Sequence, residues 1–154
     1  MKMERVAEII KGWPYDGSIS RAEVVKDGST LVNGDWVVKQ SDGTVDKPSG
    51  AVTLASGSVG LVVVGNGDSA SAANSGKAEV LWSSFIAKIS SAGYTAGSYA
   101  PGTSFSVNAG KPVLATLASG TGSTFAPGDA VVGTVLDVVA VSTTETAHIT
   151  VLVK

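Results

Sequence analysis

Residues Gly60–Ala70 read GLVVVGNGDSA, an apolar run that leads into the pattern G-x-G-x-x-A. In a Rossmann unit, such a run precedes a helix whose N-terminus holds the pyrophosphate of a dinucleotide. Residues 69–77, SASAANSGK, contain no aliphatic side chain larger than alanine that would pack such a helix on a sheet. Glu79 comes too early for the acidic residue that ends the next strand of the unit. The stretch therefore predicts a strand followed by a turn, and no dinucleotide site.

Similar valine-rich runs recur along the chain after residue 20, separated by Gly, Asn, Asp, Pro and Ser. Short β-strands bounded by turn residues have this pattern. The runs are AEVV, DWVVKQ, AVTL, SVGLVVV, AEVLW, FIAKIS, TSFSVN, PVLATL, AVVGTVLDVVAV and AHITVLV. They predict one all-β domain over residues 21–154, folded as a compact barrel or sandwich.

The chain also carries a weak internal repeat with a lag of about 70 residues. GDWVVKQSDG at 34–43 is similar to GTSFSVNAG at 102–110, since both open a strand after glycine and end on glycine. Each is followed by a V-G-x-V strand, at 59–62 and at 132–135. The repeat predicts two pseudo-symmetric halves that close on each other.

The N-terminal segment differs from the rest of the chain because its apolar residues have helical spacing. In MERVAEIIKGW at 3–13, Val6, Ile9, Ile10 and Trp13 follow the i, i+3, i+4, i+7 pattern of an amphipathic helix. A helix of two to three turns is not stable alone in water, so its apolar side must dock on a protein surface. We expect residues 1–20 to form a helix or arm that packs on its own domain or on a partner. Together with Tyr15, these four residues are the candidate contacts to a partner subunit.

Composition limits the classes of partner. The 154 residues carry a net charge of −2, and only nine of the charged side chains lie after residue 50. We therefore expect neither a nucleic acid nor an anionic membrane as partner. No apolar run is long enough for a membrane-spanning helix, and the N-terminus lacks a signal-peptide pattern, so we expect synthesis in a cytoplasm. A surface with so few charges favours packing against neighbouring subunits.

Groups that commonly act in catalysis are scarce. Cysteine is absent, and His148 is the only histidine. The alternation in AHITVLVK places His148 opposite Ile149 and Val151, on the face expected to be solvated. No serine lies in a G-x-S-x-G pattern, no P-loop is present, and the acidic residues are scattered. We expect a protein that is no enzyme and binds no cofactor, metal ion or small-molecule substrate.

Most aromatic residues lie in or beside the predicted strands and are expected in the core: Trp36, Trp82, Phe85, Phe105 and Phe125. Tyr94 and Tyr99 flank the glycine-rich loop AGYTAGSYAPG. Exposed tyrosines between glycines form either a recognition surface, for example for a sugar, or a plain turn.

The passage Asn33–Val64, followed by Pro101–Val153 with its PGDAVVGTV and ITVL segments, resembles the small β-rich family of predicted capsid-cement proteins. These belong to the capsid decoration proteins of tailed bacteriophages. The likeness covers about residues 30–154, is one of pattern and composition, and leaves the role of the first 30 residues open.

This resemblance implies a non-enzymatic virion protein, made in the host bacterial cytoplasm, that binds the exterior of the assembled capsid. Such proteins act as homotrimers that clamp neighbouring major capsid protein subunits against the pressure of packaged DNA. The N-terminal contacts would then face the capsid or another subunit of the trimer. The alternative is a carbohydrate-binding or adhesin-like β module on a phage fibre or a cell surface, with its site on the loop Gly93–Gly102.

Overall fold

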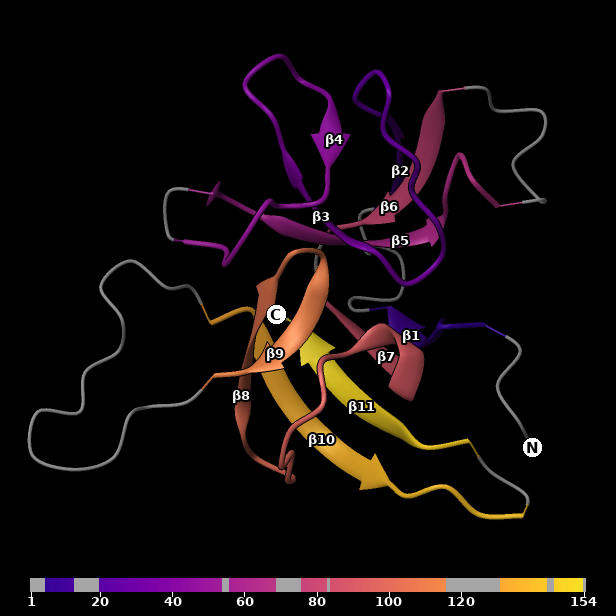
Figure 1. Cartoon of the computed structure of the whole chain (residues 1–154), viewed down its shortest axis with the longest axis vertical. Helices are drawn as coiled ribbons and strands as arrows, with labels where there is room; N and C mark the ends of the chain where they lie inside the picture. Colours follow the sequence, from indigo (N-terminus) through magenta and orange to yellow (C-terminus); the bar gives the residue numbers. More distant parts are fainter. Residues whose placement is uncertain are drawn as a thin grey trace, which may run out of the picture.

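The computed structural model describes residues 5–12, 20–53, 56–68, 76–82, 84–115, 131–143 and 146–153. They form two antiparallel sheets arranged as a sandwich (Figure 1). The smaller sheet, at the top of Figure 1, has the order β2-β6-β5-β3-β4, and the larger sheet below has the order β1-β7-β11-β10-β8-β9. The strands are β1 Ala7–Gly12, β2 Ser20–Val24, β3 Trp36–Lys39, β4 Val45–Asp46, β5 Val59–Val64, β6 Lys77–Leu81, β7 Phe85–Ser90, β8 Ser104–Asn108, β9 Lys111–Leu114, β10 Gly133–Val139 and β11 His148–Val153.

The described ranges contain no α-helix; they include the short 3₁₀ turn Ser91–Gly93 (η3). None of the described residues forms a helix long and apolar enough to cross a membrane. The prediction of an all-β fold is therefore confirmed for the described part of the chain.

The same strand order occurs twice along the chain. Strands β2 to β6 form the smaller sheet in the order β2-β6-β5-β3-β4, and β7 to β11 follow the matching order β7-β11-β10-β8-β9. Strand β1 is an addition at the outer edge of β7. The V-G-x-V runs enter the equivalent strands β5 and β10, so the sequence repeat corresponds to a repeat in topology.

Of the two predicted architectures, barrel and sandwich, the structure has the sandwich, because the two sheets are separate and neither closes into a barrel. In the smaller sheet, an isolated parallel bridge between Val25 and Val45 brings the edges β2 and β4 together at one end. Lys26 N donates to Val45 O there, at 3.0 Å. Since β4 has only two residues, the bridge does not extend into a ladder.

The main core lies between the sheets. Its buried residues include Trp36, Val38, Leu61 and Leu81 from the smaller sheet and Phe85, Ile89, Phe105, Val135, Ile149 and Val151 from the larger one. A second core lies on the other face of the smaller sheet and contains Val25, Leu31, Val37, Val45, Val62, Ala78 and Val80. The predicted core positions of Trp36, Phe85 and Phe105 are confirmed, and Phe125 lies outside the described residues.

The prediction of an N-terminal helix is wrong for residues 7–12, which form β1. This strand pairs antiparallel with β7, with Ala7 opposite Ile89, and a bulge interrupts the register between Ile9 and Lys11. Pairing with β7 satisfies backbone groups that a short isolated helix would leave exposed at its ends. β-branched isoleucines also favour a strand. The tertiary contact therefore overrides the helical spacing.

His148 is buried, with 5% of its surface exposed, so the prediction that it is solvated is wrong. It begins β11, which lies between β7 and β10, and it is opposite Ser90 and Val139 on these neighbours. Its Nδ1 lies 2.9 Å from Thr146 O. The alternation of a strand assigns residues to two faces but does not tell which face is covered.

Candidate functional site

The glycine-rich turn after β5 packs tightly against the loop that precedes β3. A Cβ on Gly65 would overlap the carbonyl group of Leu31, so the space that a phosphate would need is filled. Asn66 Oδ1 accepts a hydrogen bond from Leu31 N at 2.7 Å. Asp68 Oδ2 accepts hydrogen bonds from Gly65 N at 2.7 Å and from Asn33 N at 2.8 Å. The prediction of a turn over residues 65–68 is confirmed, and residues 69–75 lie outside the described part.

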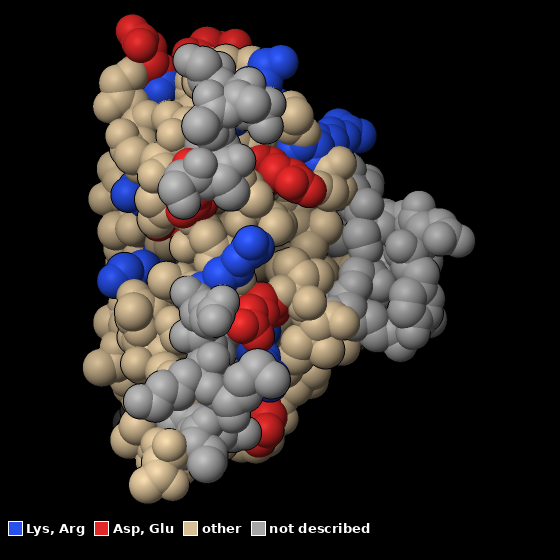
Figure 2. All heavy atoms as spheres, turned by 90° about the vertical axis from the view of Figure 1, so that its right-hand side faces the viewer, with Lys and Arg blue, Asp and Glu red and all other residues tan. Residues whose placement is uncertain are grey.

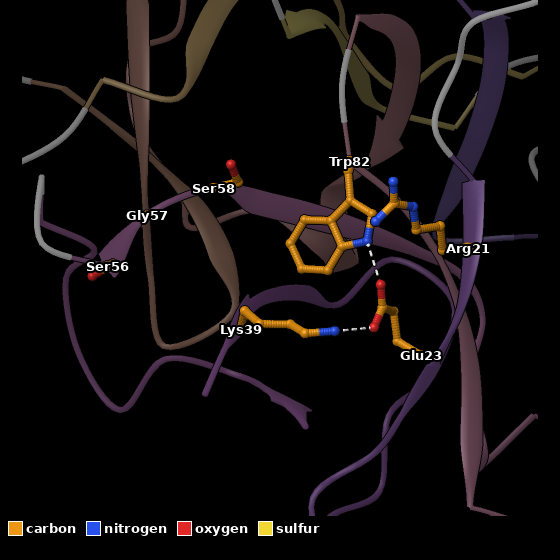
Figure 3. A pocket seen from close by; sticks show the side chains of 7 residues that line it. All are labelled: Arg21, Glu23, Lys39, Ser56, Gly57, Ser58 and Trp82. Atoms are coloured by element: carbon orange, nitrogen blue, oxygen red, sulfur yellow. Dashed lines mark hydrogen bonds and ion pairs between the residues drawn. The ribbon is translucent and has the colours of Figure 1, made fainter. Parts of the chain in front are cut away.

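A hollow of about 350 Å³ opens on the outer face of the smaller sheet, the face turned away from the larger sheet (Figure 3). Arg21 and Glu23 reach it from β2, opposite Val80 and Ala78 of the second core. The residues that line it are Arg21, Glu23, Lys39, Ser56, Gly57, Ser58 and Trp82. The hollow therefore lies beside the second core, where β2 and β3 are not joined by backbone pairing.

Among the described residues, the charged groups of the hollow include one cation, Arg21, without a counterion. Glu23 is buried, and its carboxylate forms an ion pair with the Lys39 ammonium. Its other oxygen accepts a hydrogen bond from Trp82 Nε1 at 3.0 Å (Figure 3). No described residue forms an ion pair with Arg21. A group that enters the hollow thus meets an indole, serine hydroxyls and an unpaired guanidinium, which suits an anionic group.

The Trp82 indole packs over Gly60 of the neighbouring strand β5, which has no side chain. A Cβ on Gly60 would lie 2.9 Å from Trp82 Cε3, so only glycine leaves room for the indole there. Trp82 was expected in the core; it is half-buried, packs against the second core and also lines the hollow. Sequence reasoning missed the hollow, although the alternating Arg21 and Glu23 on a short strand were a signal for a polar face.

The structure separates the predicted N-terminal contact residues. Val6 lies against Gly34 and Gly93 of its own domain, where a Cβ on either glycine would overlap its side chain. Ile9 and Ile10 on β1 remain 37% and 51% exposed. Trp13 and Tyr15 lie outside the described residues.

Strand β1 is fastened at its first residue. Ala7 N donates to Asn33 Oδ1 at 3.0 Å, and Asn33 Nδ2 donates to Ala7 O at 3.1 Å. Asn33 Nδ2 also donates to Val63 O at 2.9 Å, which ties β1 to the smaller sheet. The exposed isoleucines therefore belong to a fixed edge strand.

A second group of exposed apolar side chains accompanies β10 of the larger sheet. Its members are Val131, Leu136, Val138 and Val141. Figure 2 shows the face on the right-hand side of Figure 1, where charged side chains are scattered among many uncharged ones. The described surface thus combines sparse charges with exposed aliphatic residues at β1, at β10 and at Val24 and Val32 of the smaller sheet and its loop.

The two loop tyrosines pack on each other. The rings of Tyr94 and Tyr99 meet edge to face, with centroids 5.2 Å apart, and both pack against the main core. Tyr99 Oη donates to Thr95 O at 2.7 Å. Burial raises the pKa of both hydroxyl groups above the ordinary value of 10.0. Because Tyr99 uses its hydroxyl inside the loop, this geometry favours the plain turn over a sugar-binding platform.

Asp35, before β3, gives a prediction for the pH dependence of stability. Burial raises the pKa of its carboxyl group above the ordinary 3.8, although Val32 N donates to Oδ2 and Lys47 Nζ lies 3.8 Å away. The unfolded chain therefore ionises this group at lower pH than the folded protein, and stability falls as the pH rises from 3.8 through the folded pKa. Below 3.8 both states are protonated and the contribution vanishes.

We expect Asp35→Asn to remove this fall from the curve of unfolding free energy against pH, measured by urea unfolding from acid to neutral pH. Asp42→Asn is the control with the opposite sign, because hydrogen bonds from Thr44 lower the pKa of Asp42. An unchanged curve for Asp35→Asn would contradict the assigned environment of this carboxyl group.

Within the described ranges, no three His, Cys, Asp or Glu side chains lie close enough together to hold a metal ion. Comparisons of the chain with protein-family models, with curated proteins and with solved structures gave no match.

Proposed function

We propose that the protein is a structural component of a phage virion. It binds the outside of the assembled head as a homotrimer and cements neighbouring major capsid protein subunits against the pressure of packaged DNA. The proposal starts from the resemblance of residues 30–154 to capsid-cement proteins. It is supported chiefly by exposed Ile9 and Ile10 on the edge strand β1 of a charge-poor body. In this role the protein needs no catalytic centre, cofactor, nucleic acid or membrane.

The energetics of such contacts fit this role. Full burial of one isoleucine side chain contributes about 1.5–3 kcal/mol, part of which is lost to the cost of association. After Ala7, whose N–H and C=O bond to Asn33, the edge of β1 that faces away from β7 pairs with no described strand and offers backbone groups for a partner strand. A trimer that engages several capsid subunits at once converts modest contacts into strong binding. Few surface charges need to be desolvated when such faces meet.

Sedimentation with purified phage heads tests this proposal. We expect the protein to pellet with the heads, before or after their expansion, and to have the mass of a trimer in solution. The double variant Ile9→Thr, Ile10→Thr keeps β-branched residues in β1 and should pellet several-fold less, with unfolding nearly unchanged. Val141→Thr replaces an exposed valine just after β10, which is separated from β1 by β7 and β11, and is the matched control. Failure to pellet with any form of the heads would contradict the proposal.

A further inference from the structure

The repeated strand order identifies an edge of the smaller sheet that corresponds to the binding place of β1. In the larger sheet, β1 pairs with the outer edge of β7. Strand β2 takes the place of β7 in the smaller sheet, because β2 pairs with β6 as β7 pairs with β11. In the described part of the chain, no strand pairs with the outer edge of β2 over Ser20–Val24. The smaller sheet thus has five strands where its counterpart has six.

Along this edge, the backbone of β2 has hydrogen-bonding groups that pair with no described strand, except at its C-terminal end beside β4. Val25 N donates to Gly76 O at 2.8 Å, so the odd-numbered residues of β2 are the ones whose backbone groups bond to β6. Because antiparallel ladders alternate, the backbone groups of Ala22 and Val24 point away from β6. Lys26 is the next residue whose backbone groups point away from β6, and its N–H donates to Val45 O at 3.0 Å in the bridge to β4. In a parallel bridge of this register the Val24 carbonyl also accepts from Val45 N, so β4 occupies the edge as far as that carbonyl. The N–H and C=O of Ala22 and the N–H of Val24 remain for a further strand.

The side chains on the two faces of β2 differ in chemistry. Arg21 and Glu23 lie on the face with the hollow, where Glu23 is bound to Lys39 and Trp82 and Arg21 has no ion pair with a described residue. Val24 lies on the other face and is 51% exposed. A strand added beside β2 would place alternate side chains on these two faces. One set would meet the guanidinium at the rim of the hollow, and the other would meet an aliphatic side chain.

We propose that the edge of β2 binds an extended segment of another protein as a sixth strand, antiparallel to β2. The segment alternates acidic residues, which pair with Arg21 beside the hollow, with aliphatic residues, which cover Val24. The orientation follows from the repeat, because β1 is antiparallel to β7. Backbone hydrogen bonds supply part of the affinity, and the guanidinium supplies the preference for acidic side chains. The inference is independent of the proposed role on the phage head.

The test uses the full-length protein, labelled with ¹⁵N, and two capped synthetic peptides, TVEVEVT and TVKVKVT. We expect TVEVEVT to bind with the largest amide shifts at Ala22 and Val24, and to bind at least about tenfold more tightly than TVKVKVT. Equal affinity for the two peptides would overturn the role of Arg21. No binding of TVEVEVT at millimolar concentration, or shifts centred away from β2, would overturn the proposal.

Two variants separate the backbone contribution from the charge contribution. Ala22→Pro removes an N–H that points away from β6, so the fold should persist while the affinity for TVEVEVT falls at least about tenfold. Arg21→Glu should reverse the preference between the two peptides. Arg5→Glu makes the same change of charge at an exposed residue before β1 and should preserve the preference. Binding of TVEVEVT without sedimentation on phage heads would support this inference and contradict the proposed function.

Discussion

Replacing Trp36 with alanine is expected to lower the free energy of unfolding by about 3–5 kcal/mol, the cost typical of deleting a buried aromatic side chain. Trp36 is completely buried at the centre of the main core. Its ring centroid lies 6.0 Å from that of Phe85 and 5.7 Å from that of Phe105, both on the opposite sheet. The backbone ladders hold the two sheets in place, so the cavity cannot collapse completely.

Urea unfolding followed by circular dichroism measures this loss. Trp36→Phe should cost less than the alanine variant, because it keeps a ring in the core. It also removes an indole N–H that has no hydrogen-bond partner among the described residues. Trp82→Ala is the control for a half-buried tryptophan and should also cost less. If Trp36→Ala cost less than about 1 kcal/mol, the two sheets would not share the core described above.

The substitution Gly65→Ala is expected to cost about 3 kcal/mol, at the upper end of the range for overpacking. The added methyl group would overlap the carbonyl of Leu31 and lie 2.7 Å from Val32 N. Both neighbours are backbone atoms, which cannot rotate away as a side chain does. The loop before β3 would have to shift, together with the hydrogen bond from Leu31 N to Asn66 Oδ1.

Gly50→Ala is the matched control, because a Cβ at Gly50 has no neighbour within 4 Å and its backbone is not left-handed. It should be neutral or slightly stabilising, since alanine restricts the unfolded chain. The pair is compared by thermal unfolding under identical conditions. Equal stability of the two variants would mean that the turn after β5 has space beside Gly65. The interpretation of GLVVVGNGDSA as a phosphate-binding turn would then have to be considered again.

Much of the fold could be predicted because strands leave a local signal. Valine-rich runs between turn residues located most of the strands, and the similarity of residues 34–43 to 102–110 anticipated the repeated strand order. The N-terminal segment was misassigned for a specific reason. Its apolar residues match a helical spacing, but Val6 precedes the strand and packs on Gly34 and Gly93, whereas Ile9 and Ile10 stay exposed on β1. The pairing with β7 that decides the structure joins residues about 80 positions apart, which a local pattern does not contain.

The hollow could not be predicted, because its residues meet only through the sheet. Glu23 contacts Lys39, 16 residues further along the chain, and Trp82, 59 residues further. Such contacts depend on strand order and register, which a local pattern does not contain. The burial of His148 has the same origin, since it depends on β7 and β10 lying on both sides of β11.

The place of β1 has a consequence for the order in which the protein folds during its synthesis. All strands of the smaller sheet lie between Ser20 and Leu81, so this half can pair its strands soon after it leaves the ribosome. Strand β1 is translated first but must wait for Phe85–Ser90 before it finds its partner. Until then both backbone edges of β1 are open to other nascent chains, and we expect this long-range pairing to be slower than the pairing within the smaller sheet.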